Sequence, residues 1–240
     1  MMMRHRTGLP RWWFGLVGVT GVALILGVLH ALWFAPTERT MGTVQRIFYY
    51  HVSSAWTAFV AFFINFLACL AYVKTRRPKW DAVAVSAAEV GVIFGTVNLI
   101  TGPIWAKPVW GIWWTWDARL TSTLVMWLLY VSYLLLRQFA AEHPGQRVWA
   151  AAFGIFAFVD VPIVYLSIRL WRTQHPGPVI AGGEQSGIDP RMFLALHVCF
   201  AAFLLLFFVL FYWRYRLEQQ RAELAELRAR LQRWHMDRLA

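Results

Sequence analysis

The sequence predicts an all-α integral membrane protein with six transmembrane helices and a C-terminal helical tail. Of its 240 residues, 59% are hydrophobic and 15% are charged, and its mean hydropathy is +0.49. Soluble domains carry about 45–50% apolar and about 25% charged residues. One bilayer crossing needs about 20 mostly apolar helical residues. Helices are expected because only helices and closed barrels satisfy their own backbone hydrogen bonds in lipid.

Six apolar runs have the length of a crossing. They are Trp12–Phe34, Ile47–Val73, Val83–Thr101, Leu120–Leu136, Val148–Ile168 and Met192–Trp213. The first run follows three arginines, as a signal peptide does, but it is long and has no small-residue cleavage site, so we interpret it as a retained anchor. The connections are too short to fold separately. We therefore predict one membrane domain, residues 1–213, and a basic tail, residues 214–240.

The net charge of +11 indicates membrane topology rather than nucleic-acid binding, because the basic residues lie mostly at the ends of the apolar runs and in the tail. With both termini in the cytoplasm, sixteen of the 23 Lys and Arg lie inside, as the positive-inside rule predicts. The tail places Leu217, Leu224, Leu227, Leu231 and Trp234 near heptad a and d positions. It either continues the sixth helix and packs against a partner or lies on anionic lipid.

The connection between the third and fourth runs holds the stretch "WGIWWTWDARL", residues 110–120. Pro108 and Gly111 predict that no continuous helix runs through it. If Trp110 to Asp117 forms two helical turns, Trp110, Trp113, Trp114 and Asp117 share one face. That face is either an interfacial anchor, because indoles favour the headgroup level, or a platform for a planar aromatic ligand.

Charged and imidazole groups accompany these tryptophans. Asp117 either caps the fourth helix or contributes a charge to the platform, and Arg119 is suited to bind a carboxylate with its guanidinium fork. Four histidines are predicted at the same outer level: His30, His51, His175 and His197. Imidazole is a common metal ligand, and depth alone does not choose among the four. A planar ligand with axial imidazoles, an aromatic bed and a cation for carboxylates describes haem.

Glu89 and Asp160 lie inside apolar runs, where a charge is costly and therefore a candidate for function. Pro162 cannot donate to the carbonyl of Phe158, so a kink is predicted near Asp160. These acids form either an entry path for haem or, as we favour, polar contacts between helices. Cys69 and Cys199 are expected at different depths, which predicts no disulfide. The sequence has no C-x-x-C-H motif for covalent haem attachment.

The run "TGPIWAKPVWGIWWTWDARLTS", residues 101–122, resembles the tryptophan-rich WWD signature of proteins that handle haem in cytochrome c maturation. Three further segments, "RIFYYHVSSAW" (46–56), "DVPIVYLSIRLWRTQHPG" (160–177) and "SGIDPRM" (186–192), together with the chain length, resemble the CcmC family. The resemblance implies a multi-pass protein of the bacterial inner membrane that holds haem b non-covalently at the periplasmic face. It further implies delivery to the haem chaperone CcmE, in an ABC transporter complex with the ATPase CcmA, CcmB and CcmD, and no enzymatic activity of its own.

The resemblance also implies site residues. The axial ligands are His51, in "FYYHV", and His175, in "RTQHPG", while His30 and His197 match no family ligand. The WWD loop, residues 102–119, would bed the porphyrin on Trp110, Trp113, Trp114 and Trp116. Arg119, with Arg46 or Arg172 as alternatives, would pair with the propionates. Gln174 and Pro176 beside His175 depart from the family pattern. The pattern therefore supports His51 as a ligand more strongly than His175.

Two other functions remain as alternatives. A CcsA-type subunit of a cytochrome c synthase is disfavoured because such chains usually have more crossings and further histidines. A permease for haem or another solute needs a polar path through the membrane, for which Asn65, Glu89 and Asp160 are the candidates.

Overall fold

The structure, a computed structural model, describes residues 9–140, 143–175 and 187–239. Its helices are α1 (Arg11–Leu29), a π-helical turn (His30–Phe34), a 3₁₀ turn (Thr43–Arg46), α2 (Ile47–Thr75), α3 (Pro78–Trp110), α4 (Ala118–Phe139), α5 (Gln146–Phe158), α6 (Asp160–Leu170) and α7 (Pro190–Leu239). The helices α5 and α6 together form one crossing. Six helical segments are long and apolar enough to span a membrane, and the described residues form no strand, which confirms the predicted fold class.

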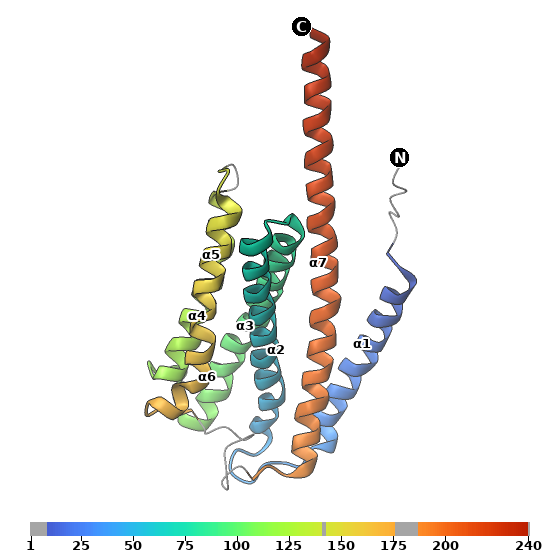
Figure 1. The fold of residues 1–240 in the computed structure, drawn as a ribbon. Helices are drawn as coiled ribbons and strands as arrows, with labels where there is room; N and C mark the ends of the chain where they lie inside the picture. The colour runs from blue at the N-terminus through green and yellow to red at the C-terminus, as the bar shows by residue number, and fades with distance from the viewer. Residues whose placement is uncertain (1–8, 141–142, 176–186, 240) are drawn as a thin grey trace.

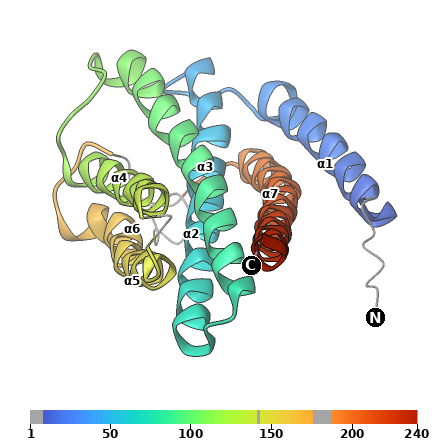
Figure 2. The same cartoon turned by 90° about the horizontal axis from the view of Figure 1, so that it is seen from above.

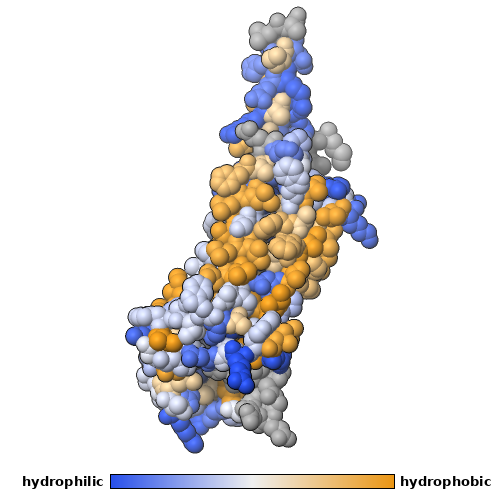
Figure 3. Space-filling model, turned by 90° about the vertical axis from the view of Figure 1, so that its left-hand side faces the viewer, coloured by the Kyte–Doolittle hydropathy of each residue, from blue (hydrophilic) through white to orange (hydrophobic). Residues whose placement is uncertain are grey.

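The helices α2 and α3 form a central hairpin, with α4 and α5–α6 on one side and α7 and α1 on the other (Figure 2). The beginning of α1 and the end of α7 point to the same end of the bundle (Figure 1). We call that the inner end. The connections 35–46, 111–117 and 171–175 gather at the opposite, outer end (Figure 1). An apolar band lies between the two polar ends (Figure 3), as expected where side chains face lipid.

The third crossing is longer than predicted, because α3 passes through Pro103 and Pro108 before it ends at Trp110. The prediction that no continuous helix runs through the tryptophan stretch is confirmed, but the break occurs at Gly111 and not at Pro108. A proline costs a hydrogen bond, but its φ suits a helix and helix packing in membranes tolerates it. Gly111 does end the helix, with φ 76° and its N–H bonded to the carbonyl of Lys107 at 2.9 Å.

The crossing formed by α5 and α6 is interrupted beside Asp160, where the sequence predicts a kink. The helical pattern is interrupted at Val159, where α5 gives way to α6, and the N–H of Val159 bonds to the carbonyl of Phe156 at 3.1 Å. Pro162 follows within the first turn of α6 and cannot donate a hydrogen bond.

Ion pairs join the helices towards the inner end, and Glu89 takes part in one of them. Arg214 of α7 donates to Glu89 of α3, with Nη2 2.6 Å from Oε1, and to Glu218 at 2.7 Å. Glu89 is therefore a polar contact between helices, as favoured above. The continuation of the sixth crossing into the tail is confirmed, because α7 is one helix of 50 residues. The division between residues 213 and 214 stays a prediction.

The cysteines follow the prediction too. Cys69 lies in α2 and Cys199 in α7, and both are free and buried.

Close packing of the central hairpin gives a first test. A Cβ on Gly91 of α3 would lie 2.5 Å from the Phe62 ring, which stacks on Tyr130 with a centroid distance of 3.6 Å. We expect Gly91→Ala to destabilise the protein by about 1–3 kcal/mol, because the ring has no room to move away. The control is Gly18→Ala in α1, where a Cβ meets nothing within 4 Å. Thermal unfolding of both variants in detergent measures the difference, and equal midpoints would contradict the packing.

Candidate functional site

His51 lies in the second turn of α2, near the outer end and against α3. Its Nδ1 is 3.0 Å from Oγ1 of Thr101, and that hydroxyl donates to the carbonyl of Val97 at 2.8 Å. A hydroxyl has one proton to donate, so towards His51 it acts as acceptor. The contact therefore favours the tautomer with the proton on Nδ1. This leaves the lone pair of Nε2 available for a metal, as in other sites where a neighbouring group orients a histidine ligand.

Two further residues of α3 hold the His51 ring in place. The amide nitrogen of Asn98 donates to the backbone carbonyl of His51 at 3.1 Å and is 3.3 Å from each ring nitrogen. An amide equally far from both nitrogens is not in line with either lone pair, so the bond to the carbonyl is the well-directed one. At Gly102 a Cβ would lie 3.4 Å from Cε1 of His51. That distance is an ordinary van der Waals contact, so the glycine backbone lies directly beside the ring.

A cavity of about 140 Å³ brings the two predicted ligands together. His51 from α2 and His175 from the connection after α6 both line it, although the chain separates them by four crossings. Trp110 and Trp114 line the same cavity. The backbone N–H of His175 donates to Oγ1 of Thr173 at 2.9 Å, a local bond that shapes this connection.

A second cavity of about 900 Å³ opens beside the first. The two share a wall that includes Trp56, Trp105, Arg119 and His175. A volume of 900 Å³ lies within the range of about 300–1,000 Å³ that is usual for small-molecule and cofactor sites. Together the cavities form an apolar chamber at the outer end, with imidazole and guanidinium groups in its walls.

Sequence reasoning missed Trp56 and Trp105 as wall residues. The available signal was their position, since Trp56 lies in the segment "RIFYYHVSSAW" and Trp105 in "TGPIWAKP". Trp105 also approaches His51, with ring centroids 5.7 Å apart. Both rings lie between the two cavities and contribute to each.

The tryptophans of the loop are divided between the cavity wall and the exposed surface. Residues 111–117 contain no helix, so the condition under which Trp110, Trp113, Trp114 and Asp117 would share a helical face is not met. Trp110 and Trp114 line the smaller cavity. Trp113 and Trp116 are 57% and 76% exposed and line neither cavity. A non-helical segment has no 3.6-residue period to bring the four indoles to one side.

Asp117 is the N-cap of α4, the structural alternative considered above. Its Oδ1 accepts from the N–H of Leu120 at 3.0 Å, and its Oδ2 accepts from the hydroxyl of Thr115 at 3.1 Å. Asp117 lines neither cavity, whereas Arg119 lines both. The guanidinium of Arg119 donates to the carbonyl of Val164 in α6. This bond holds it against the chamber wall.

The remaining sequence candidates lie outside the chamber. Arg46 donates to the carbonyl of Ala31 at 3.3 Å, and neither it nor Arg172 lines a cavity. His30 and His197 each contact the carbonyl of the residue four positions earlier, at 2.9 Å in both cases. Neither histidine lines a cavity. Depth in the membrane therefore did not distinguish His30 and His197 from His51 and His175. Their position relative to the chamber does.

Comparison with known proteins identifies the family. The family model described as "CcmC: Heme exporter protein C" matches residues 4–230, which include every residue that lines the two cavities. The chain belongs to the CcmC family.

Curated relatives agree with the CcmC match. "Heme exporter protein C" of Haemophilus influenzae is 35% identical over 204 residues, which cover 83% of this chain and 81% of the relative. The protein of the same name from Escherichia coli K12 is 34% identical over 224 residues, or 90% and 88% of the two chains. That from Bradyrhizobium diazoefficiens is 33% identical over 197 residues, or 81% and 74%.

Proposed function

We propose that the chain binds haem b non-covalently at the periplasmic face of the bacterial inner membrane and delivers it to the haem chaperone CcmE for c-type cytochrome biogenesis. The observation that carries the proposal is the chamber at the outer end, where His51 and His175 line one cavity beside a second of cofactor size. Membership of a family described as heme exporter protein C supports haem as the cargo.

The residues around the chamber suit haem. His51 presents Nε2 while Thr101 engages Nδ1, and His175 supplies a second imidazole. Trp56, Trp105, Trp110 and Trp114 offer apolar ring faces for a planar macrocycle. Arg119 provides a cation for a carboxylate. Ligation by two histidines leaves no open iron position, so the chain would hold and transfer its cargo rather than catalyse a reaction.

The proposed orientation puts the chamber in the periplasm and both termini in the cytoplasm. The distribution of Lys and Arg supports it, because the inner end carries the larger share. In this orientation the tail of α7 extends into the compartment where the ATPase CcmA works, with CcmB and CcmD as the further partners in the membrane. The outer end faces CcmE.

Haem transfer to the chaperone tests this function. With CcmE co-expressed, wild-type protein is expected to yield CcmE that keeps covalently attached haem on a denaturing gel, and His175→Ala is expected to yield none. Attachment of haem to a cytochrome without any chaperone would instead support the CcsA-type alternative. ATP-dependent haem flux through this chain alone would support a permease.

The tautomer argument predicts an effect of Thr101. Thr101→Val removes the acceptor for Nδ1–H of His51, and we expect haem affinity to fall by about 10–100-fold, as for other groups that orient metal ligands. Thr101→Ser keeps the hydroxyl and is expected to restore affinity to within a fewfold. Haem titration in the Soret region measures both, with the shift of the haem midpoint potential as a second readout. Equal affinities for the Val and Ser variants would refute the role of the hydroxyl.

A further inference from the structure

The larger cavity carries arginines from three separate segments. Arg39 comes from the connection between α1 and α2, Arg119 from α4, and Arg169 from the last turn of α6. The guanidinium of Arg169 lies over the ring of Tyr165, 5.2 Å from its centroid, and Tyr165 lines the same cavity. This cation–π contact holds the Arg169 side chain along the wall.

Two carboxylates of the described residues, Glu38 and Asp189, also line this cavity, and both accept from backbone N–H groups. Oε2 of Glu38 accepts from the N–H groups of Thr40 at 2.7 Å and Met41 at 2.5 Å. Oδ1 of Asp189 accepts from the N–H of Arg191 at 2.8 Å. These acids shape the turns in which they lie. Among the described residues, three guanidinium groups thus line the cavity, and the two carboxylates accept hydrogen bonds from backbone N–H groups of their own turns.

Much of the remaining cavity wall is apolar. Phe48, Trp56, Trp105, Met192 and Leu196 contribute rings and aliphatic chains from α2, α3 and α7. A ligand that matches both parts of the wall has a large apolar body and anionic groups on one edge. Haem has this chemistry, because its two carboxylates extend from one side of the macrocycle.

We propose that Arg39 and Arg169 form a carboxylate-binding subsite in the larger cavity, which receives the propionate edge of haem. The inference rests on the proposed function and extends it. In this arrangement the carboxylates of haem lie beside the α1–α2 connection and the end of α6. It also replaces Arg46 and Arg172, the sequence-based alternatives, with two arginines that do line the chamber.

The test varies the ligand and the protein together. Purified full-length protein in detergent is titrated with iron protoporphyrin IX and with its dimethyl ester, which has no free carboxylates. Bonds between charged groups contribute enough to change a dissociation constant by about tenfold or more. We expect esterification to weaken binding to wild-type protein by at least about tenfold. Arg169→Gln and Arg39→Gln should each weaken haem binding several-fold, and they should leave the affinity for the ester unchanged.

The ester also serves as the folding control, because a variant that still binds it normally retains the chamber. Arg172→Gln is the matched control, since Arg172 is three residues from Arg169 but lines no cavity. Equal affinity of wild-type protein for haem and ester would overturn the subsite while leaving the proposed function intact. An equal loss in Arg172→Gln and Arg169→Gln would overturn it too. Failure of wild-type protein to bind either compound would overturn the proposed function itself.

Discussion

Protein with His51→Ala or His175→Ala is expected to bind haem at least about 100-fold more weakly than wild type. Each change removes one of the two imidazoles that line the smaller cavity. Partners that merely orient a metal ligand already contribute about 10–100-fold to affinity, so loss of the ligand itself should cost more. Haem content per polypeptide after purification, together with Soret titration, measures the effect.

Two histidines outside the chamber provide matched controls. His30→Ala and His197→Ala remove rings whose Nδ1 contacts lie within their own helices. Both variants are expected to retain wild-type haem content. If His197→Ala lost haem while His175→Ala kept it, the assignment of the second ligand would be wrong.

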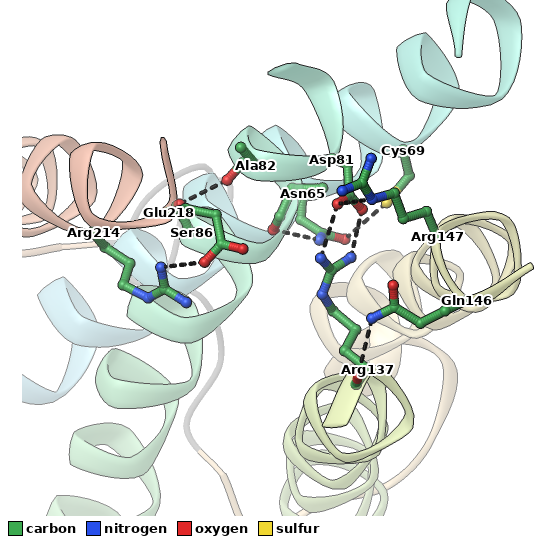
Figure 4. A network of polar contacts seen from close by, with 11 residues as sticks. Asn65, Cys69, Asp81, Ala82, Ser86, Arg137, Gln146, Arg147, Arg214 and Glu218 are labelled. Carbon is green, nitrogen blue, oxygen red and sulfur yellow. Dashed lines mark hydrogen bonds and ion pairs between the residues drawn. The ribbon is translucent and has the colours of Figure 1, made fainter. Parts of the chain in front are cut away.

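Asp81→Ala is expected to destabilise the protein by about 3–5 kcal/mol, the usual cost of leaving a buried charge without its partner. Arg137 of α4 makes two bonds to Asp81 of α3, at 2.5 and 2.9 Å, and only about a tenth of either side chain is exposed (Figure 4). Arg147 of α5 approaches the same carboxylate at 3.4 Å. One acid thus joins three helices at the inner end, and its removal leaves Arg137 buried without compensation.

An exposed pair in the tail is the control for this change. Arg230 and Glu226 lie 2.6 Å apart, with 64% and 63% of their side chains exposed. Such pairs contribute about 0–1 kcal/mol, so Glu226→Ala should unfold close to the wild-type midpoint. Thermal unfolding in one detergent compares the two variants. A midpoint for Asp81→Ala equal to that of Glu226→Ala would mean that the buried pair does not stabilise the bundle.

Most of the fold was predictable from the sequence. Apolar runs of bilayer length gave the six crossings, because a transmembrane helix needs a fixed number of apolar residues. Local chemistry predicted the helix interruption before Pro162 and the end of α3 at Gly111, and it gave the cap at Asp117 as one of two alternatives. The ion pair of Asp81 and Arg137 was not predicted, since its partners are 56 residues apart and no local pattern joins them.

The candidate site was predictable only in part. Family motifs selected His51 and His175, and the structure places both at one cavity. The shared face of Trp110, Trp113, Trp114 and Asp117 depended on a helix that does not form after Gly111. The bed of four loop tryptophans, which the family resemblance implies, stays a prediction. Trp56, a wall residue, belongs to a transmembrane helix, where an indole near the membrane boundary is ordinary. Only tertiary packing reveals that its ring faces the chamber.

The central claim is that two histidines bind the iron of haem in the outer chamber. The most direct measurement is the electron paramagnetic resonance spectrum of the purified, oxidised complex. Ligation by His51 and His175 predicts a low-spin ferric signal in wild-type protein and its loss when either histidine is replaced by Ala. A high-spin signal in wild-type protein, or a low-spin signal that survives in both variants, would contradict the claim.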